Sequence, residues 1–260
     1  MVSSWSAKGS LRHRFNHWLF RHVDFVTSVG DKALQDLIDL YEFPSASAAV
    51  IRRGIPEEQY DKTLQRQLLL DKFGFASDAR ILMHVGQFSA EKNHPFLIES
   101  FVRIKARYPS AKLILIGEGV NYRRIVDEVS GKGLAHDIVF AGYQNNVQGW
   151  LAGADMFVLT STIEGVPGVV LEAGMQEVPS VAVKVGGVGE VIQNGITGLL
   201  VEQHDADQFA EAVLYFLQHE DKRIACGKAA AKLVKTSFSV SSCASAFEKI
   251  YSQMQQQPTK

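Results

Sequence analysis

Glu164 and Glu172 flank a turn that links a strand-like apolar run to a helix-like segment. The residues between them are small or apolar, and the first turn of a helix leaves its backbone amides without partners inside the helix. Those amides, at the positive end of the helix dipole, suit a diphosphate. A carboxylate does not bind phosphate, but it accepts hydrogen bonds from hydroxyl groups. The arrangement therefore fits a nucleotide sugar, with one glutamate on a sugar ring and the other on a ribose.

A structural interpretation competes with this one. Glu164 would cap the start of the helix, and Glu172 would be a solvated helical side chain. Spacing alone favours the structural interpretation, so the surrounding sequence has to decide between them.

Short apolar runs and amphipathic segments alternate between residues 80 and 201. Strands that alternate with helices predict βαβ units, right-handed crossovers and a parallel sheet. In such a sheet a ligand lies beyond the carboxyl ends of the strands, where glycines follow the predicted strands here. The sequence thus predicts an α/β fold with a doubly wound parallel sheet. The predicted strands are 80–85, 112–116, 137–141, 155–160, 180–184 and 197–201, and the predicted helices are about 94–107, 121–131, 145–153, 168–176 and 187–193.

The flanks of this region have a different pattern. Residues 23–28 and 48–54 predict two further strands joined by a helix over 31–41, which are too few elements for a complete second domain of this class. After residue 201 the pattern is helical, over about 206–218, 221–235 and 239–254.

The bulk composition restricts the function classes. The chain has 260 residues, a formal net charge of −1 and 46% apolar residues, which is ordinary for a globular protein and does not suggest a nucleic-acid partner. Its two cysteines, Cys226 and Cys243, have no metal-ligand spacing and favour a cytoplasmic setting. No apolar run approaches the roughly 20 residues that span a bilayer.

A basic amphipathic helix is predicted near the N-terminus. It fits either peripheral contact with an anionic membrane or packing on its own domain with the basic residues in water. The second interpretation is the more ordinary one, and the sequence leaves both open. The basic residues of this helix are Lys8, Arg12, Arg14 and Arg21, and the apolar residues at helical spacing are Leu11, Phe15, Trp18 and Leu19.

Other polar groups have ordinary structural explanations. Asp205 and Asp207 match the Asp-x-Asp pattern of metal-dependent transferases, but Asp205 stands where a helix N-cap is expected. His84 lies within an apolar strand and is interpreted as a core residue, and His94 is expected to order the loop after that strand. The eight histidines show no zinc-ligand spacing, so no metal is expected.

The order of the motifs adds a family resemblance. From about Val23 to the C-terminus the chain resembles family 4 of the glycosyltransferases, with Glu164 to Glu172 as its Glu–seven residues–Glu signature. The upstream segments that resemble the family are VGQFSAEKNHPFLIESF, LILIGEGVNY and VFAGYQNNVQGWLAGADMFVLTSTIEG, and the downstream segment is VPSVAVKVGGVGEVIQNGITGLLV.

The resemblance implies a Rossmann-like GT-B architecture, a retaining mechanism and a role for each matching residue. Glu164 and Lys92 are the implied catalytic residues: Glu164 would contact hydroxyls of the donor sugar, and Lys92 would neutralise charge on the departing diphosphate. Glu172 would accept hydrogen bonds from the ribose, and Gly86 would let a loop approach the phosphates. The other implied donor-binding residues are Gln87, Gly142, Tyr143, Ser161, Gly165, Val166, Gly168, Val169 and Val170.

Three positions depart from the family pattern. Gln87 stands where the family usually has Arg and brings no charge, and a charge-assisted hydrogen bond is roughly twice as strong as a neutral one. We therefore expect weaker diphosphate binding or another cation. Pro167 replaces a Gly and removes one amide donor, although Pro suits the first turn of a helix. Glu177 replaces the first Gly of the downstream segment.

By the resemblance we expect residues 1–57 to be a remnant of the N-terminal acceptor domain, 58–237 the nucleotide-sugar-binding domain, and 238–260 a C-terminal crossing helix and tail. The expected function is transfer of a sugar from a nucleotide-diphosphate sugar to a hydroxyl of a carbohydrate or lipid-linked acceptor, without a cofactor. The alternatives are a non-catalytic binding subunit that needs a separate acceptor-domain protein, and an inactive truncated copy. A polysaccharide product follows only by analogy.

Overall fold

The computed structural model describes residues 10–255. Lys8 of the predicted basic helix and the tail beyond residue 255 therefore lie outside the described residues. Within the described part, no helix is long and apolar enough to cross a membrane.

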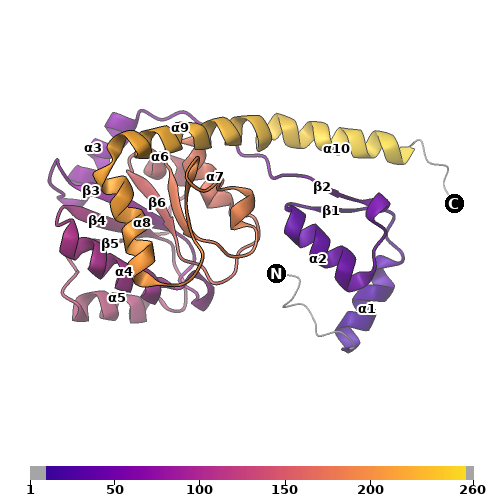
Figure 1. Ribbon diagram of the computed structural model, residues 1–260, viewed down its shortest axis with the longest axis horizontal. Helices are drawn as coiled ribbons and strands as arrows, with labels where there is room; N and C mark the ends of the chain where they lie inside the picture. The colour runs from indigo at the N-terminus through magenta and orange to yellow at the C-terminus, as the bar shows by residue number, and fades with distance from the viewer. Residues whose placement is uncertain (1–9, 256–260) are drawn as a thin grey trace.

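A six-stranded parallel sheet forms the centre of the larger part of the molecule (Figure 1). Its strand order is β5-β4-β3-β6-β7-β8, so the chain steps outward from β3 in one direction and then returns to build the other half. The point where the order reverses lies between β3 and β6, and ligands of such sheets bind beyond the carboxyl ends of the strands at that point. This confirms the predicted doubly wound α/β fold. The strands are β3 (Arg80–Val85), β4 (Ala111–Ile116), β5 (Ile138–Gly142), β6 (Met156–Leu159), β7 (Ser180–Val183) and β8 (Gly198–Val201).

Helices cover both faces of this sheet, because its strands are apolar on both sides. Successive side chains of a strand point to opposite faces, so Leu82 joins one core cluster while Ile81 and Met83 join the other. The first cluster is closed by α4 (His94–Arg107), α5 (Tyr122–Gly131) and α8 (Ala206–Gln218). The second is closed by α3 (Lys62–Phe73), α6 (Val147–Ala152), α7 (Gly168–Met175) and α9 (Glu220–Ser237).

The N-terminal segment forms a small second unit. Its strands β1 (Val26–Ser28) and β2 (Ala48–Val50) pair in parallel as a separate two-stranded sheet. The helices α1 (Leu11–Phe20) and α2 (Asp31–Tyr41) and the 3-10 turn η2 (Ser45–Ser47) complete this unit. The long helix α10 (Val240–Gln255) runs from the six-stranded unit toward it (Figure 1).

Gly54 marks the place where α10 meets the chain that leaves β2. A Cβ atom on Gly54 would lie 2.8 Å from the Cα of Val240, so only glycine fits this approach. Next to it, Ile55 forms a β-bridge with Ser239.

The structure corrects two of the predicted elements and adds one that was not predicted. The predicted helix 187–193 is wrong, because only the 3-10 turn η4 (Val188–Glu190) forms there. The glycines of this segment disfavour an α-helix, and Gly186 has a left-handed φ of 53°. The predicted strand 48–54 ends already at Val50. Helix α3 was not predicted, although Asp61 caps its start and the left-handed Gly74 ends it.

Candidate functional site

Two loops meet beyond the carboxyl ends of β3 and β6. The first follows β3 and contains the 3-10 turn η3 (Ala90–Lys92), and the second leads from β6 into α7. The amide of Thr162 donates to the carbonyl of Glu91 at 2.8 Å, and the Thr160 hydroxyl donates to the carbonyl of Lys92 at 3.0 Å. These bonds fix the two loops to each other at the reversal point of the sheet.

Lys92 and Glu164 form an ion pair across these loops. Lys92 Nζ lies 2.5 Å from Glu164 Oε1, and the Ser161 hydroxyl donates to the same oxygen at 2.6 Å. The Glu164 side chain is only 11% exposed. The structure thus brings together three predicted site residues that the sequence separates, and it holds one carboxylate in a fixed orientation.

The start of α7 has no side-chain cap. Pro167 occupies the N-cap position, and no side chain accepts a hydrogen bond from the amides of the first turn. The interpretation of Glu164 as a helix cap is therefore wrong, because its carboxylate is bound by Lys92 and Ser161 instead. Gly168 and Val169 at the helix start are half-buried, while Val170 points into the core and is buried.

Glu172 lies one turn inside α7 and is half-buried. Burial raises the pKa of Glu172 above its usual value, and the nearby Glu58 adds to this shift, whereas Arg53 opposes it. Unlike Glu164, the carboxylate makes no hydrogen bond to another described residue. Its pKa is raised chiefly because the carboxylate is buried, and the charge of Arg53 only partly offsets this effect.

Arg53 stands at the start of α7 and was missed as a site residue. A Cβ atom on Gly168 would lie 2.5 Å from Arg53 Nη1, so the guanidinium lies directly against this glycine. The sequence offered a signal, since Arg52 and Arg53 precede Gly54 at the end of a predicted strand. That strand was assigned to the other unit, and only the tertiary structure places its arginine beside α7.

Glycines bring the loop after β4 onto the loop after β3. Gly117 has a φ of 136°, and a Cβ atom there would lie 2.1 Å from the carbonyl oxygen of Gly86. The amide of Phe88 donates to the carbonyl of Glu118 at 2.9 Å, and the amide of Gly86 donates to Ile116 at 3.0 Å. Gln87 remains exposed at the rim of this crossing.

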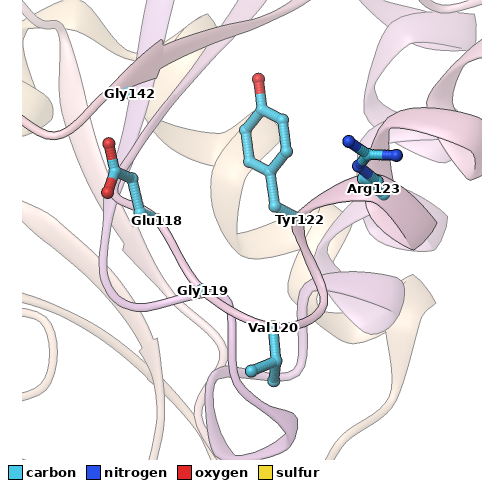
Figure 2. A pocket seen from close by; sticks show the side chains of 6 residues that line it. All are labelled: Glu118, Gly119, Val120, Tyr122, Arg123 and Gly142. Carbon is cyan, nitrogen blue, oxygen red and sulfur yellow. The ribbon is translucent and has the colours of Figure 1, made fainter.

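A cavity of about 530 Å³ opens beside these loops. Figure 2 shows Glu118 and Tyr122 on the same side of the loop after β4, with Arg123 at the start of α5. Gly142, at the end of β5, completes the wall, and Tyr143 beside it is 68% exposed. Of the two predicted site residues at the end of β5, Gly142 lines this cavity and Tyr143 follows it in the sequence.

Two buried histidines, His84 and His94, flank the loop after β3. His84 is fully buried, and its Nδ1 lies 2.9 Å from the carbonyl oxygen of Val158, which confirms its assignment to the core. His94 stacks on Phe88 with 4.2 Å between ring centroids and meets His84 edge-on. Burial lowers the pKa of His84 to about 4 and that of His94 to about 3, so both rings are neutral.

Asp205 is a helix N-cap. Its Oδ1 accepts hydrogen bonds from the amides of Asp207 and Gln208 at 2.9 and 3.0 Å. Asp207 pairs with Arg103. Across residues 10–255, no group of three or more His, Cys, Asp or Glu side chains is placed to hold a metal ion.

Comparison with known proteins assigns this arrangement to a family. Residues 65–233 match the family described as "Glycosyl transferases group 1". The chain belongs to the group 1 glycosyl transferases. The resemblance deduced from the motif order is confirmed at this level, and the narrower assignment to family 4 stays a prediction.

Relatives of this group 1 glycosyl transferase carry names that differ from one another. N-acetyl-alpha-D-glucosaminyl L-malate synthase of Bacillus anthracis is 30% identical over 88% of this chain and 59% of its own length. The lipopolysaccharide core biosynthesis glycosyltransferase LpsE of Rhizobium meliloti is 32% identical over 55% of this chain and 41% of its own length. The chain thus spans about three fifths or less of the length of these relatives.

A solved structure confirms the fold. Anabaena Alr3699/HepE, crystallised in complex with UDP and glucose, matches with a TM-score of 0.82 at 19% identity, over 93% of this chain and 66% of that chain. At this identity the likeness shows the fold alone, which is the GT-B glycosyltransferase fold.

Proposed function

We propose that this group 1 glycosyl transferase binds a nucleotide-diphosphate sugar at the start of α7 and takes part in retaining transfer of the sugar to an acceptor hydroxyl. The observation that carries the proposal is the uncapped start of α7, with the hydrogen-bonded carboxylate of Glu164 on one side and the half-buried carboxylate of Glu172 on the other. Free amides and a helix dipole attract a diphosphate, and each carboxylate accepts hydroxyl hydrogen bonds.

The ion pair of Lys92 with Glu164 prepares both residues for the donor. When the diphosphate binds, the Lys92 ammonium turns its charge to the phosphate oxygens, and Glu164 keeps its orientation through Ser161. Charge that develops on the leaving diphosphate is then stabilised by Lys92 and the amides of α7. The protein positions the reactants and stabilises charge, so no metal or other cofactor is part of this proposal.

Arg53 supplies the cation that Gln87 lacks. Its guanidinium lies against Gly168, where the diphosphate would bind, and it forms no ion pair with another described residue. Arginine suits this task because its planar fork binds phosphate oxygens in a bidentate manner. The donor would thus be held by Lys92 from one unit and by Arg53 from the segment that leaves the other.

The cavity beside β5 is the place for the nucleotide base. It is lined by Gly142 and by the Tyr122 ring (Figure 2). An aromatic ring offers a stacking surface to a base, and the Glu118 carboxylate accepts hydrogen bonds from ring N–H groups. The HepE structure contains UDP, which makes a uridine nucleotide the first ligand to test here.

A thermal-shift screen against UDP, GDP, ADP and their sugars tests the proposal. A ligand at 100 times its dissociation constant stabilises the folded protein by about 2.7 kcal/mol. Glu164→Ala is expected to remove the preference for the nucleotide sugar over the free nucleotide diphosphate. Glu202→Ala, which removes an exposed ion pair with Lys184, is the matched control. Unaltered nucleotide-sugar binding by Glu164→Ala would refute the site.

A second candidate function is a binding subunit that works with a separate acceptor-domain protein. Two observations favour it. Within the described residues β1 and β2 pair only with each other, whereas parallel strands are ordinarily buried inside larger sheets. The apolar side chains of α1 are also exposed. Turnover that needs no added protein would exclude this candidate. The exposed apolar residues of α1 are Leu11, Phe15, Trp18 and Leu19.

Peripheral membrane contact is an alternative to a protein partner for the exposed apolar residues of α1. The exposed Trp18 and Phe15 pack against each other with ring centroids 6.0 Å apart, and arginines flank them in the sequence. Apolar area combined with basic charge binds anionic lipid surfaces. Co-sedimentation with vesicles of anionic phospholipid, but not with zwitterionic vesicles, is the expected result, and Trp18→Ser should abolish it.

A further inference from the structure

Glu190 joins the two units of the molecule. Its carboxylate accepts a hydrogen bond from the amide of Asp31 at 2.7 Å and one from the amide of Lys32 at 3.1 Å. The Arg52 guanidinium lies 3.3 Å from the same carboxylate and 2.6 Å from the Asp31 side chain. The Glu190 side chain is only 15% exposed. A carboxylate of the six-stranded unit therefore caps a helix, α2, of the N-terminal unit.

The loop that carries Glu190 also supports the loop that carries Glu164. The amide of Gly187 donates to the carbonyl oxygens of Glu164 and Gly165 at 3.3 and 3.1 Å. A Cβ atom on Gly186 would lie 1.8 Å from the Glu164 carbonyl oxygen, so the two loops are in direct backbone contact. Gly187 lies three residues before Glu190, so the loop that carries Glu190 is bonded directly to the backbone of Glu164.

Direct packing accompanies the charged contact. A Cβ atom on Gly30, the residue before α2, would lie 2.6 Å from Val166 Cγ2. A narrow cavity between the units is lined by Lys32 and Asp36 of α2 on one side and by Glu164 on the other. The start of α2 thus faces the place where the donor sugar is proposed to bind.

We propose that Glu190 is a positioning residue: it holds the start of α2 against the loop between β6 and α7 that carries Glu164, and so closes the cavity between the two units. Carboxylates bind helix starts well because the amides are unpaired and the dipole is favourable, and the bond to Arg52 adds a charge-assisted contact. The contact fixes the position of α2 relative to Glu164. The effect of this contact on sugar transfer rests on the proposed function, whereas the contact between the two units does not.

Distance measurement between the units tests the closure without any substrate. Spin labels at Gln35→Cys and Lys132→Cys, both exposed positions, report the distance between α2 and the six-stranded unit in a background of Cys226→Ala and Cys243→Ala. Glu190→Ala is expected to lengthen and broaden the distance distribution. Glu202→Ala, an exposed glutamate paired with Lys184 on the same unit, should leave it unchanged. A distribution in Glu190→Ala that matches the parent protein would overturn the proposal.

Glu190→Gln provides a second test if the alanine variant does not fold. It keeps the size of the side chain and loses its charge, so it should give a broader distribution with a preserved melting temperature, and an unchanged distribution would again overturn the closure. Kinetics separate a positioning role from a binding role. In the Glu190 variants kcat should fall tenfold or more, while the affinity for UDP should change less than twofold. Failure of every variant to bind a nucleotide would refute the proposed function and leave the distance result to decide on Glu190.

Discussion

At the scale of single residues, the site is short of positive charge for a diphosphate. Lys92 already shares its charge with Glu164, Gln87 is neutral, and Arg53 comes from outside the six-stranded unit. Under the proposed function, each of these side chains contributes to phosphate binding, and the charge at these positions sets the affinity.

Gln87→Arg should raise the affinity for nucleoside diphosphates. Gln87 is exposed at the rim of the loop after β3, so the longer side chain fits without repacking. A charge-assisted bond in place of a neutral one contributes about 1 kcal/mol more, which is roughly fivefold in affinity. Calorimetric titration with UDP, GDP and ADP measures the change, and Arg53→Ala should change the affinity in the opposite direction. Equal affinities in the parent protein and Gln87→Arg would show that the loop after β3 does not contact the phosphates.

Glu172→Gln should separate stability from binding. Burial raises the folded-state pKa of Glu172 above its unfolded value, so the ionised carboxylate disfavours the folded state at pH values above that pKa. The variant should melt at the same or a higher temperature than the parent protein at neutral pH. This difference should vanish as the pH falls through the raised pKa toward the unfolded value.

The same variant should bind nucleotides about tenfold more weakly, because a hydrogen bond to a charged acceptor contributes about 1.5 kcal/mol or more. Melting curves at neutral and acidic pH and titration at neutral pH are the measurements. A variant that melts lower and binds as tightly as the parent would assign Glu172 to structure alone.

At the scale of elements, the loop from β6 to α7 owes its shape to close backbone contact with the loop after β7. Gly186→Ala should displace the loop that carries Glu164, since the added Cβ would lie 1.8 Å from its carbonyl oxygen and the φ of 53° is strained for alanine. We expect a loss of about 2–3 kcal/mol in the free energy of unfolding and weaker binding of the nucleotide sugar. Gly195→Ala is the matched control, because Gly195 has a φ of 76° but no atom within 4 Å of the added Cβ. Equal effects of the two changes on binding would show that the contact does not shape the loop.

The loop after β3 should make the protein sensitive to acid. His84 and His94 have folded-state pKa values of about 4 and about 3, far below the value of about 6.5 in an unfolded chain. Protons therefore bind preferentially to the unfolded state as the pH falls below 6.5, and stability is lost from there downward. Between pH 7 and pH 5, the protonation of each histidine should lower the free energy of unfolding by about 2 kcal/mol.

His94→Phe should flatten this dependence, since phenylalanine keeps the stacking on Phe88 and cannot be protonated. Urea unfolding at pH 7 and pH 5 measures the slope of the unfolding free energy against pH. His136→Phe, at an exposed position, should keep the slope of the parent protein. A slope that His94→Phe leaves unchanged would contradict the neutral, buried state of the ring.

The sheet and its order of elements were predictable because the strands are apolar throughout and alternate with helices. Helix α3 was not, because its residues are mostly polar and only Leu69 and Leu70 are buried. The positions of Glu164 and of the start of α7 also followed from the local pattern. Two contacts did not: the Lys92–Glu164 pair joins loops distant in sequence, and the approach of Arg53 to Gly168 depends on how the two units pack.

At the scale of the whole molecule, the two units are joined at Glu190, at Val166 and where α10 passes Gly54. Gly54→Ala should loosen this last junction, because the added Cβ would lie 2.8 Å from backbone at Val240 and 3.2 Å from the carbonyl oxygen of Ser239. We expect a lower melting temperature and a larger radius of gyration by small-angle scattering. Gly131→Ala, where nothing lies within 4 Å of the added Cβ, should change neither. An unchanged radius in Gly54→Ala would mean that α10 does not set the arrangement of the units.

The grip of Glu190 on α2 has a consequence for how this protein can vary. Its two shortest bonds across the units go to main-chain amides of residues 31 and 32, and every amino acid except proline carries such a donor. The side chains at these two positions can therefore vary while both main-chain bonds of the joint are kept, although a change of Asp31 also removes its ion pair with Arg52. One glutamate in the loop after β7 would then hold α2 in place in relatives that differ in the side chains at the start of this helix.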